Sequence, residues 1–166
     1  YTVSSTHERQ TGGVSMSEKT FEIGIPVDEN GFLEMECDFC KNRFMLHADT
    51  FQDESYLHFF CPICGLANET DTFYCTEVLE KMEQVALNYM YSELERTLGK
   101  SIKKFNRNGF VKMSMDIPKK EPEKELYQPV NEYETVELKC CDSSVKLQCF
   151  DKEIGIYCPL CGGAKL

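Results

Sequence analysis

Apolar residues alternate with polar ones in the first third of the chain, which is the pattern of β-strands that are buried on one face. The alternation runs through residues 20–27 and 43–48, and the turn-forming sequence DENG lies between them at 28–31. Two further strands are expected, FLEMEC at 32–37, which leads into Cys37, and 56–60, which leads into Cys61. We therefore predict a set of short strands that present cysteines at their ends.

A helical pattern replaces the alternation at Thr76. This residue suits a helix N-cap, and Glu77 in the first turn favours the helix dipole. Apolar residues then recur every three or four positions, at Leu79, Met82, Ala86, Met90, Leu94, Leu98, Ile102 and Phe105. We call this set the apolar stripe. It is most simply the face that covers a sheet, and the alternative is a homodimer seam.

The last third of the chain returns to strand patterns. A strand is expected at 110–115, and the segment 116–132 holds three prolines and many charges, which is typical of a linker. A strand then leads into Cys140, and a hairpin follows from Val145 to Cys158.

Ten cysteines in 166 residues is a high density, reached by disulfide-linked secreted domains and by metal-binding intracellular ones. Most of them occur as Cys-x-x-Cys or as the doublet Cys140-Cys141, which favours metal over disulfides. Thiolate ligands imply a reducing compartment, so we expect a cytoplasmic protein. No apolar run approaches the roughly 20 residues that span a bilayer, so no membrane association is expected.

Two Cys-x-x-Cys pairs in the first half have the spacing of a zinc ribbon. Zinc prefers four tetrahedral sulfur or nitrogen ligands, and each pair supplies two sulfurs to one side of the ion. The predicted ligands are Cys37, Cys40, Cys61 and Cys64. Four cysteines leave no position open for water, so this zinc is expected to be structural and no catalytic residue is predicted.

The motif aromatic-Cys-Pro-aliphatic-Cys-Gly occurs twice, as FCPICG and as YCPLCG, and forms an internal repeat. Aligning the hairpins that precede the two copies puts Cys141 on Cys40 and Cys149 on Ala48. The same alignment matches Val145 and Leu147 to Phe44 and Leu46. By this alignment Cys149 packs in the core as a small apolar residue.

We therefore predict a second structural zinc with the ligands Cys140, Cys141, Cys158 and Cys161. Adjacent ligands are less usual than a Cys-x-x-Cys pair. If Cys140 points away, Cys149 or a water completes the coordination.

The stretch PVDENGFLEMECDFCKNRF, the Cys-Pro-x-Cys-Gly motif and the helix start TDTFYCTEV resemble a group of uncharacterised bacterial double zinc-ribbon proteins of the TFIIB-like type. The resemblance covers most of residues 20–166 and is weakest in the linker. It implies a double zinc ribbon, and it supports adjacent ligands in the second site, where relatives carry Cys-His and this chain has Cys140-Cys141. It implies no activity.

Charge is distributed unevenly along the chain, whose net charge is −10. Residues 28–54 hold eight acidic residues against Lys41 and Arg43, so this part should repel phosphate. No acidic residue occurs from 100 to 115, where a basic segment consists of Lys100, Lys103, Lys104, Arg107 and Lys112. Basic residues interleaved with Phe105 and Phe110 could hold a nucleic-acid backbone, although cations are also ordinary at a helix C-terminus.

Two functions fit these features. The first is a non-catalytic adaptor that recognises a protein partner, which the acidic ribbon, the closed cysteine sites and the apolar stripe favour. The second is nucleic-acid binding through the basic segment. An enzyme is not expected, because the sequence has no Ser/His/Asp set, no phosphate-binding glycine loop and no HExxH motif. Cys75, beside the helix start, is expected to be a packed residue and not a nucleophile.

The predicted fold is α+β, with two small β-rich zinc ribbons connected by one long α-helix. A tail without structure, or residues added ahead of a start at Met16, is expected over 1–18. The predicted organisation continues with a ribbon at 19–75, helix and strand at 76–115, a linker at 116–133 and a second ribbon at 134–166.

Overall fold

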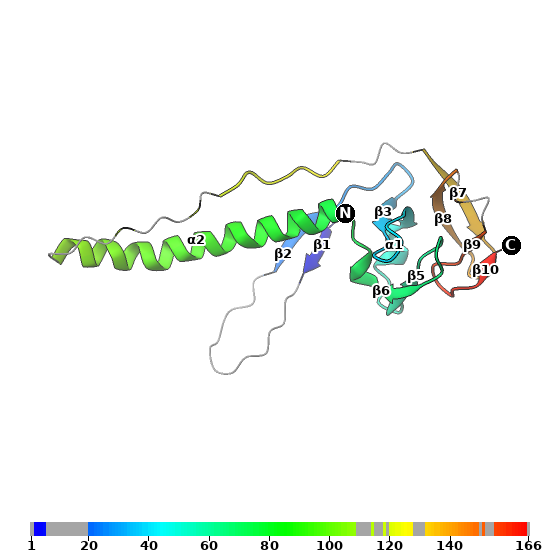
Figure 1. Cartoon of the computed structure of the whole chain (residues 1–166), viewed down its shortest axis with the longest axis horizontal. Coiled ribbons are helices and arrows are strands. Elements are labelled where there is room, and N and C mark those ends of the chain that lie inside the picture. Colours follow the sequence, from blue (N-terminus) through cyan, green and yellow to red (C-terminus); the bar gives the residue numbers. More distant parts are fainter. Residues whose placement is uncertain are drawn as a thin grey trace. The chain divides into compact units, whose positions relative to one another are not determined.

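The computed structural model describes residues 2–5, 20–108, 114, 118, 120–127, 132–149, 151 and 155–165 (Figure 1). The chain divides into two compact units. The ribbon unit comprises 1–78 and 126–166, and the helix unit comprises 79–125. The architecture is α+β, with one long helix and small antiparallel sheets.

The helices and strands have the following bounds: β1 Thr2–Ser5, β2 Phe21–Gly24, β3 Phe32–Glu36, β4 Arg43–His47, α1 Ala48–Phe51, β5 His58–Phe60, β6 Ala67–Glu69, the 3-10 turn Thr70–Phe73, α2 Thr76–Asn108, β7 Tyr133–Leu138, β8 Ser143–Gln148, β9 Ile156–Tyr157 and β10 Ala164–Lys165.

A four-stranded antiparallel sheet with the order β3-β4-β8-β7 forms the centre of the ribbon unit (Figure 1). Its outer pairs are the hairpins β3-β4 and β7-β8, which belong to the first and second ribbon. Its middle pair joins the two ribbons, with Met45 opposite Lys146 and Leu46 opposite Val145. The segments predicted as two ribbons therefore share one sheet.

An approximate twofold axis relates the two halves of this sheet. The alignment matches Phe44 to Val145 and therefore Met45 to Lys146. Because Met45 also pairs with Lys146 in the middle of the sheet, the twofold axis passes through this pair. The turns repeat as well: Lys41 and Asp142 occupy equivalent positions and both have a positive φ, 59° and 48°. The internal repeat of the sequence is thus a repeat of backbone structure.

One apolar core serves both ribbons. The matched residues Phe44, Leu46, Val145 and Leu147 are all buried in the same cluster. Their burial confirms the alignment that the repeat predicted. The exception is Cys149, which the alignment placed in the core but which is exposed. Strands β4 and β8 end at equivalent residues, but Ala48 begins helix α1 and is buried, whereas Cys149 lies in a turn.

The first turn of α2 docks onto β3 and β4. Val78 and Cys75 are buried there, and the Thr76 hydroxyl donates to Glu36 Oε1. Thr76 is the first helical residue, so it does not stand before the helix as predicted. Arg43 holds the turn in place by donating to both carboxylate oxygens of Glu77, at 2.8 and 3.0 Å.

In the helix unit, an extended segment runs along one face of α2 (Figure 1, yellow beside green). The amide side chain of Asn88 bonds both the carbonyl and the N–H of Glu121, at 2.9 and 3.1 Å. Gln84 accepts from the N–H of Lys124, and Glu80 pairs with the Lys124 ammonium. The sequence predicted only a linker over this segment.

Much of the apolar stripe is exposed in the described structure, whereas Met82 and Ile102 are half-buried. Leu79, Met90, Leu94 and Leu98 are 47, 53, 41 and 40 % exposed. The prediction that the stripe covers a sheet is therefore wrong for these four residues, although α2 itself has the predicted start and nearly the predicted end.

Two further predictions concern the chain outside the ribbons. Thr2–Ser5 form a strand paired with β2, where an unstructured tail was predicted. The predicted strand at 110–115 and Lys112 fall almost wholly outside the described residues. Among the described helices, none is long and apolar enough to span a membrane.

Candidate metal centres

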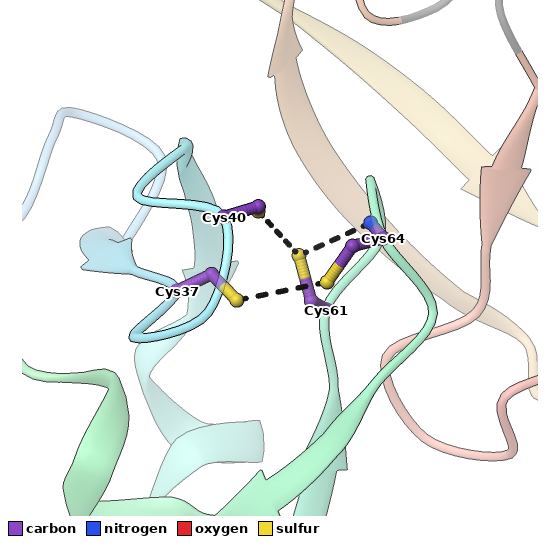
Figure 2. Close-up of side chains that lie close together, drawn as sticks. All are labelled: Cys37, Cys40, Cys61 and Cys64. Atoms are coloured by element: carbon purple, nitrogen blue, oxygen red, sulfur yellow. Dashed lines mark hydrogen bonds between the residues drawn. The ribbon is translucent and has the colours of Figure 1, made fainter.

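The first centre consists of four cysteine side chains that converge from two turns, one after β3 and one after β5 (Figure 2). The ligand atoms of Cys37, Cys40, Cys61 and Cys64 all lie within 4.8 Å of one another. Two sulfur pairs across the turns are 3.8 and 3.7 Å apart. A zinc–sulfur bond of about 2.3 Å in a tetrahedron requires sulfurs about 3.8 Å apart, and a disulfide about 2.05 Å, so the spacing fits a four-coordinate ion.

In the first centre, burial disfavours ionisation of the thiols and nearby N–H groups favour it. Burial raises the pKa of Cys61, whose side chain is fully enclosed. Burial also acts on Cys37, but the N–H groups of Cys40 and Phe39 donate toward its sulfur and leave its pKa below the usual value. A bound cation would supply the charge that burial otherwise disfavours.

The second centre has the same donor set and a more open position. Cys140, Cys141, Cys158 and Cys161 also lie within 4.8 Å of one another, and the sulfurs of Cys140 and Cys161 are 3.7 Å apart. Only Cys158 is buried, whereas Cys140 and Cys161 are exposed. The structure thus brings together all eight cysteines predicted as ligands, in the two predicted groups, and each group is compatible with a structural metal ion.

The adjacent pair Cys140-Cys141 follows from the register of the repeat. Cys141 is equivalent to Cys40. Val136 lies opposite Val145 as Met35 lies opposite Phe44, so Leu138, two residues after Val136, takes the position of Cys37. Leu138 packs in the core and is 2 % exposed, so it keeps the strand in place but offers no ligand. The missing sulfur comes from Cys140 at the exposed tip of the turn.

The thiols of the second centre differ in acidity. The N–H of Gly163 and the neighbouring thiols lower the pKa of Cys161 to about 7. The hydrogen bond with Cys161 raises the pKa of Cys141 to about 12. One proton is thus released easily from this group, as expected when several thiols share a site.

The two remaining cysteines lie outside the centres. Cys149 is not in the second group, and its thiol donates to Glu134 Oε1 at 2.7 Å. Cys75 is buried and donates to the Glu34 carbonyl, and burial raises its pKa to about 12. These properties fit the predicted packed thiol, because a nucleophile needs an accessible thiolate.

A pair of substitutions distinguishes Cys140 from Cys149 as the fourth ligand. We expect Cys149→Ser to retain two metal ions per chain and Cys140→Ser to retain one firmly bound ion, because only the Cys140 sulfur lies in the second group. The number of ions after dialysis against a weak chelator is measured by inductively coupled plasma mass spectrometry. Loss of an ion from Cys149→Ser alone would reverse the assignment.

The two centres are joined by reciprocal backbone hydrogen bonds. The N–H of Phe60 donates to the Pro159 carbonyl, and the N–H of Tyr157 donates to the Pro62 carbonyl, each at 2.8 Å. Phe60 and Tyr157 are the equivalent aromatic residues before the first cysteine of each motif, so these bonds obey the same twofold relation as the sheet.

The glycine of each motif completes the contact. Gly65 and Gly162 have φ of 72° and 69°, and each lies against the aromatic ring of the other motif. A Cβ on Gly65 would come within 3.0 Å of Tyr157, and one on Gly162 within 2.8 Å of Phe60. We call this reciprocal contact the interlock. The repeated motif is evident from the sequence, but the contact that its aromatic and glycine residues make between the two copies is not.

A second link between the ribbons was also missed. Lys146, which is 8 % exposed, donates to Asp28 Oδ2 and lies over the Phe32 ring. Burial acts to raise the pKa of Asp28, but hydrogen bonds from Lys146 and from the N–H groups of Phe32 and Asn30 outweigh it, so its pKa is lowered. The pair lies next to the twofold axis and fixes one hairpin on the other.

The basic segment is described in part. Lys100, Lys104 and Arg107 are exposed and share one face of α2, since they are spaced by four and three residues. The side chain of Lys103 and all of Lys112 lie outside the described residues.

Comparison of this chain with protein-family models, with curated proteins and with solved structures finds no match. Membership of the double zinc-ribbon group therefore stays a prediction.

Proposed function

We propose that the protein is a non-catalytic interaction module of the double zinc-ribbon type, stabilised by two structural zinc ions, that recognises a protein partner. Zinc is the proposed ion because it favours four sulfur ligands in a tetrahedron. The expected ligand set of four cysteines leaves neither ion an open position for water or substrate. This closed coordination supports a structural role and argues against metal-dependent catalysis.

The observation that carries the proposal is the exposure of large apolar side chains on the turns of the first centre. Phe39 lies between the ligands Cys37 and Cys40 and is 57 % exposed, and Leu66 follows Cys64 and is 49 % exposed. Metal ligation would fix the backbone at both positions. Apolar side chains held rigidly in solvent are typical anchors of protein interfaces, which aromatic residues dominate.

Charge on the first ribbon indicates the chemistry of the partner. Asp38, next to Phe39, pairs with Lys41, and four further acidic residues of this ribbon are exposed: Asp53, Glu54, Glu69 in β6 and Asp71 in the 3-10 turn. We therefore expect a partner surface with an apolar pocket and a basic rim, since complementary charge speeds association and excludes other partners.

The test begins with a photoreactive p-benzoylphenylalanine at position 39, used to capture and identify a partner from cells of the source organism, with position 127 as a control. Tyr127 is 79 % exposed and lies far in sequence from the cysteines of the first centre. The captured protein is then purified, and its affinity is measured by isothermal titration calorimetry. We expect Phe39→Ala to weaken binding by about 2 kcal/mol, roughly 30-fold, and Tyr127→Ala to leave it unchanged. Equal affinities for the wild type and Phe39→Ala would refute this binding surface.

Nucleic-acid binding is the second candidate, favoured by the shared exposed face of Lys100, Lys104 and Arg107. Fluorescence anisotropy with single- and double-stranded DNA and RNA tests it. Affinity that falls steeply with salt and is lost in Lys100→Glu/Lys104→Glu would establish this function. No binding at low salt would leave the protein-partner proposal.

A further inference from the structure

The apolar stripe of α2 has a symmetry of its own. Its positions are mirrored about Ser92, so that each member has a counterpart at the same distance on the other side. The mirrored pairs are Met90 with Leu94, Ala86 with Leu98, Met82 with Ile102 and Leu79 with Phe105. A twofold dimer requires this self-complementarity, because residue i of one copy contacts residue j of the other and the reverse.

The middle of the stripe and Leu79 are also available for contact. Leu79, Met90, Leu94 and Leu98 are all at least 40 % exposed. The segment 120–124 does not occupy the stripe, because it bonds Glu80, Gln84 and Asn88, which follow a different line of the helix surface. On a helix of 33 residues, a row of large apolar side chains exposed to water is thermodynamically unfavourable unless a partner covers it.

Charge along α2 favours one orientation of two copies. Residues 76–95 carry Glu77, Glu80, Glu83, Glu93 and Glu95 against Lys81 alone. Residues 96–108 carry Arg96, Lys100, Lys103, Lys104 and Arg107 and no acidic residue. Antiparallel helices bring the acidic half of each copy alongside the basic half of the other, whereas parallel helices bring like charges together.

We propose that two copies of this chain associate through the apolar stripes of α2 as an antiparallel, twofold-symmetric pair centred at the level of Ser92. Leu94 of each copy then packs against Met90 of the other, and Leu98 against Ala86. The stripe recurs about every 3.7 residues, slightly more than the helical repeat, so the two helices wrap with a right-handed crossing. This inference is independent of the proposed function, which rests on the first ribbon.

The oligomeric state of the full-length, zinc-loaded chain tests the interface. Sedimentation equilibrium is expected to show a dimer, and Leu94→Glu is expected to raise the dissociation constant at least about 100-fold, since the twofold axis buries the new charge twice. Leu57→Glu is the matched control, because Leu57 is 80 % exposed but lies in the ribbon unit. Circular dichroism of Leu94→Glu verifies that the helix persists. A monomer at all concentrations, or a dimer that tolerates Leu94→Glu as well as Leu57→Glu, would overturn the proposal.

The orientation is tested by photo-crosslinking with p-benzoylphenylalanine at position 86, in a mixture of isotopically labelled and unlabelled chains. The antiparallel pair is expected to crosslink position 86 of one copy to the tryptic peptide 97–100 of the other, since Ala86 faces Leu98. A parallel pair would crosslink it to peptide 82–96. Crosslinks between two copies of peptide 82–96 alone would contradict the antiparallel arrangement.

Discussion

Removal of both metal ions is expected to abolish the tertiary structure of the ribbon unit. Apparent binding free energies of structural zinc are about 10–16 kcal/mol per site, as large as the whole stability of a typical domain at about 5–15 kcal/mol. Without the ions, each centre would hold four thiols in contact, and burial disfavours their ionisation at Cys61 and Cys158. The turns that carry the thiols would then separate.

Amide hydrogen exchange measured by mass spectrometry, before and after chelation, tests this expectation. Peptides covering β4 and β8 report on the centre of the shared sheet, and we expect their protection to be lost on chelation. Peptides from the middle of α2 serve as the internal control, because that part belongs to the helix unit. Unchanged protection of β4 and β8 would show that the apolar core folds without metal, and the structural role of the ions would be refuted.

The second large effect is expected from Gly162→Ala, which should weaken metal binding at the first centre although Gly162 lies beside the second. The new methyl group would meet the Phe60 ring at 2.8 Å, and a φ of 69° is unfavourable for alanine. Phe60 directly precedes the ligand Cys61, and its N–H bonds the Pro159 carbonyl. Movement of Phe60 therefore disturbs both centres, and we expect a loss of about 2–4 kcal/mol in stability.

Cadmium-113 NMR of the cadmium-substituted protein can observe the two centres separately. We expect both signals to shift or broaden in Gly162→Ala. Gly99→Ala is the matched control, because Gly99 lies within α2 with nothing within 4 Å of its added Cβ, and alanine favours a helix by about 0.5–1 kcal/mol. If Gly162→Ala changed the signal of the second centre alone, the two centres would be independent and the interlock would have no energetic role.

The local elements were predictable where one periodicity dominated. The start of α2 at Thr76 and the strands around Phe44 and Val145 follow from spacing alone, because side-chain direction repeats every 3.6 residues in a helix and every two in a strand. Six of the eight cysteines of the two centres were predictable for a related reason: a Cys-x-x-Cys turn brings its own two sulfurs together regardless of the rest of the fold. The doublet Cys140-Cys141 followed from the alignment of the repeat.

Predictions failed where burial or pairing depended on parts of the chain that are distant in the sequence. Cys149 was placed in the core by its match to Ala48, but the chain continues differently after the two strands, into helix α1 at Ala48 and into a turn at Cys149. The apolar stripe was assigned to a sheet because apolar periodicity shows which residues share a face but not what covers that face. The pairing of Lys146 with Asp28 joins residues from the two ribbons, so no local pattern could reveal it.

The sequence by itself determined the α+β class, the long helix, the repeated motif and the two groups of four cysteines, because each depends on residues close together in the chain or on a repeat within it. Only the tertiary structure decided that the ribbons share one sheet and one core, that Phe60 and Tyr157 lock each motif onto the glycine of the other, and that Leu138 displaces the ligand position to Cys140. Those features depend on how β4 meets β8, and many strand pairings are compatible with the same alternation of apolar residues. The buried surface and the hydrogen bonds formed together at the twofold axis select one of them.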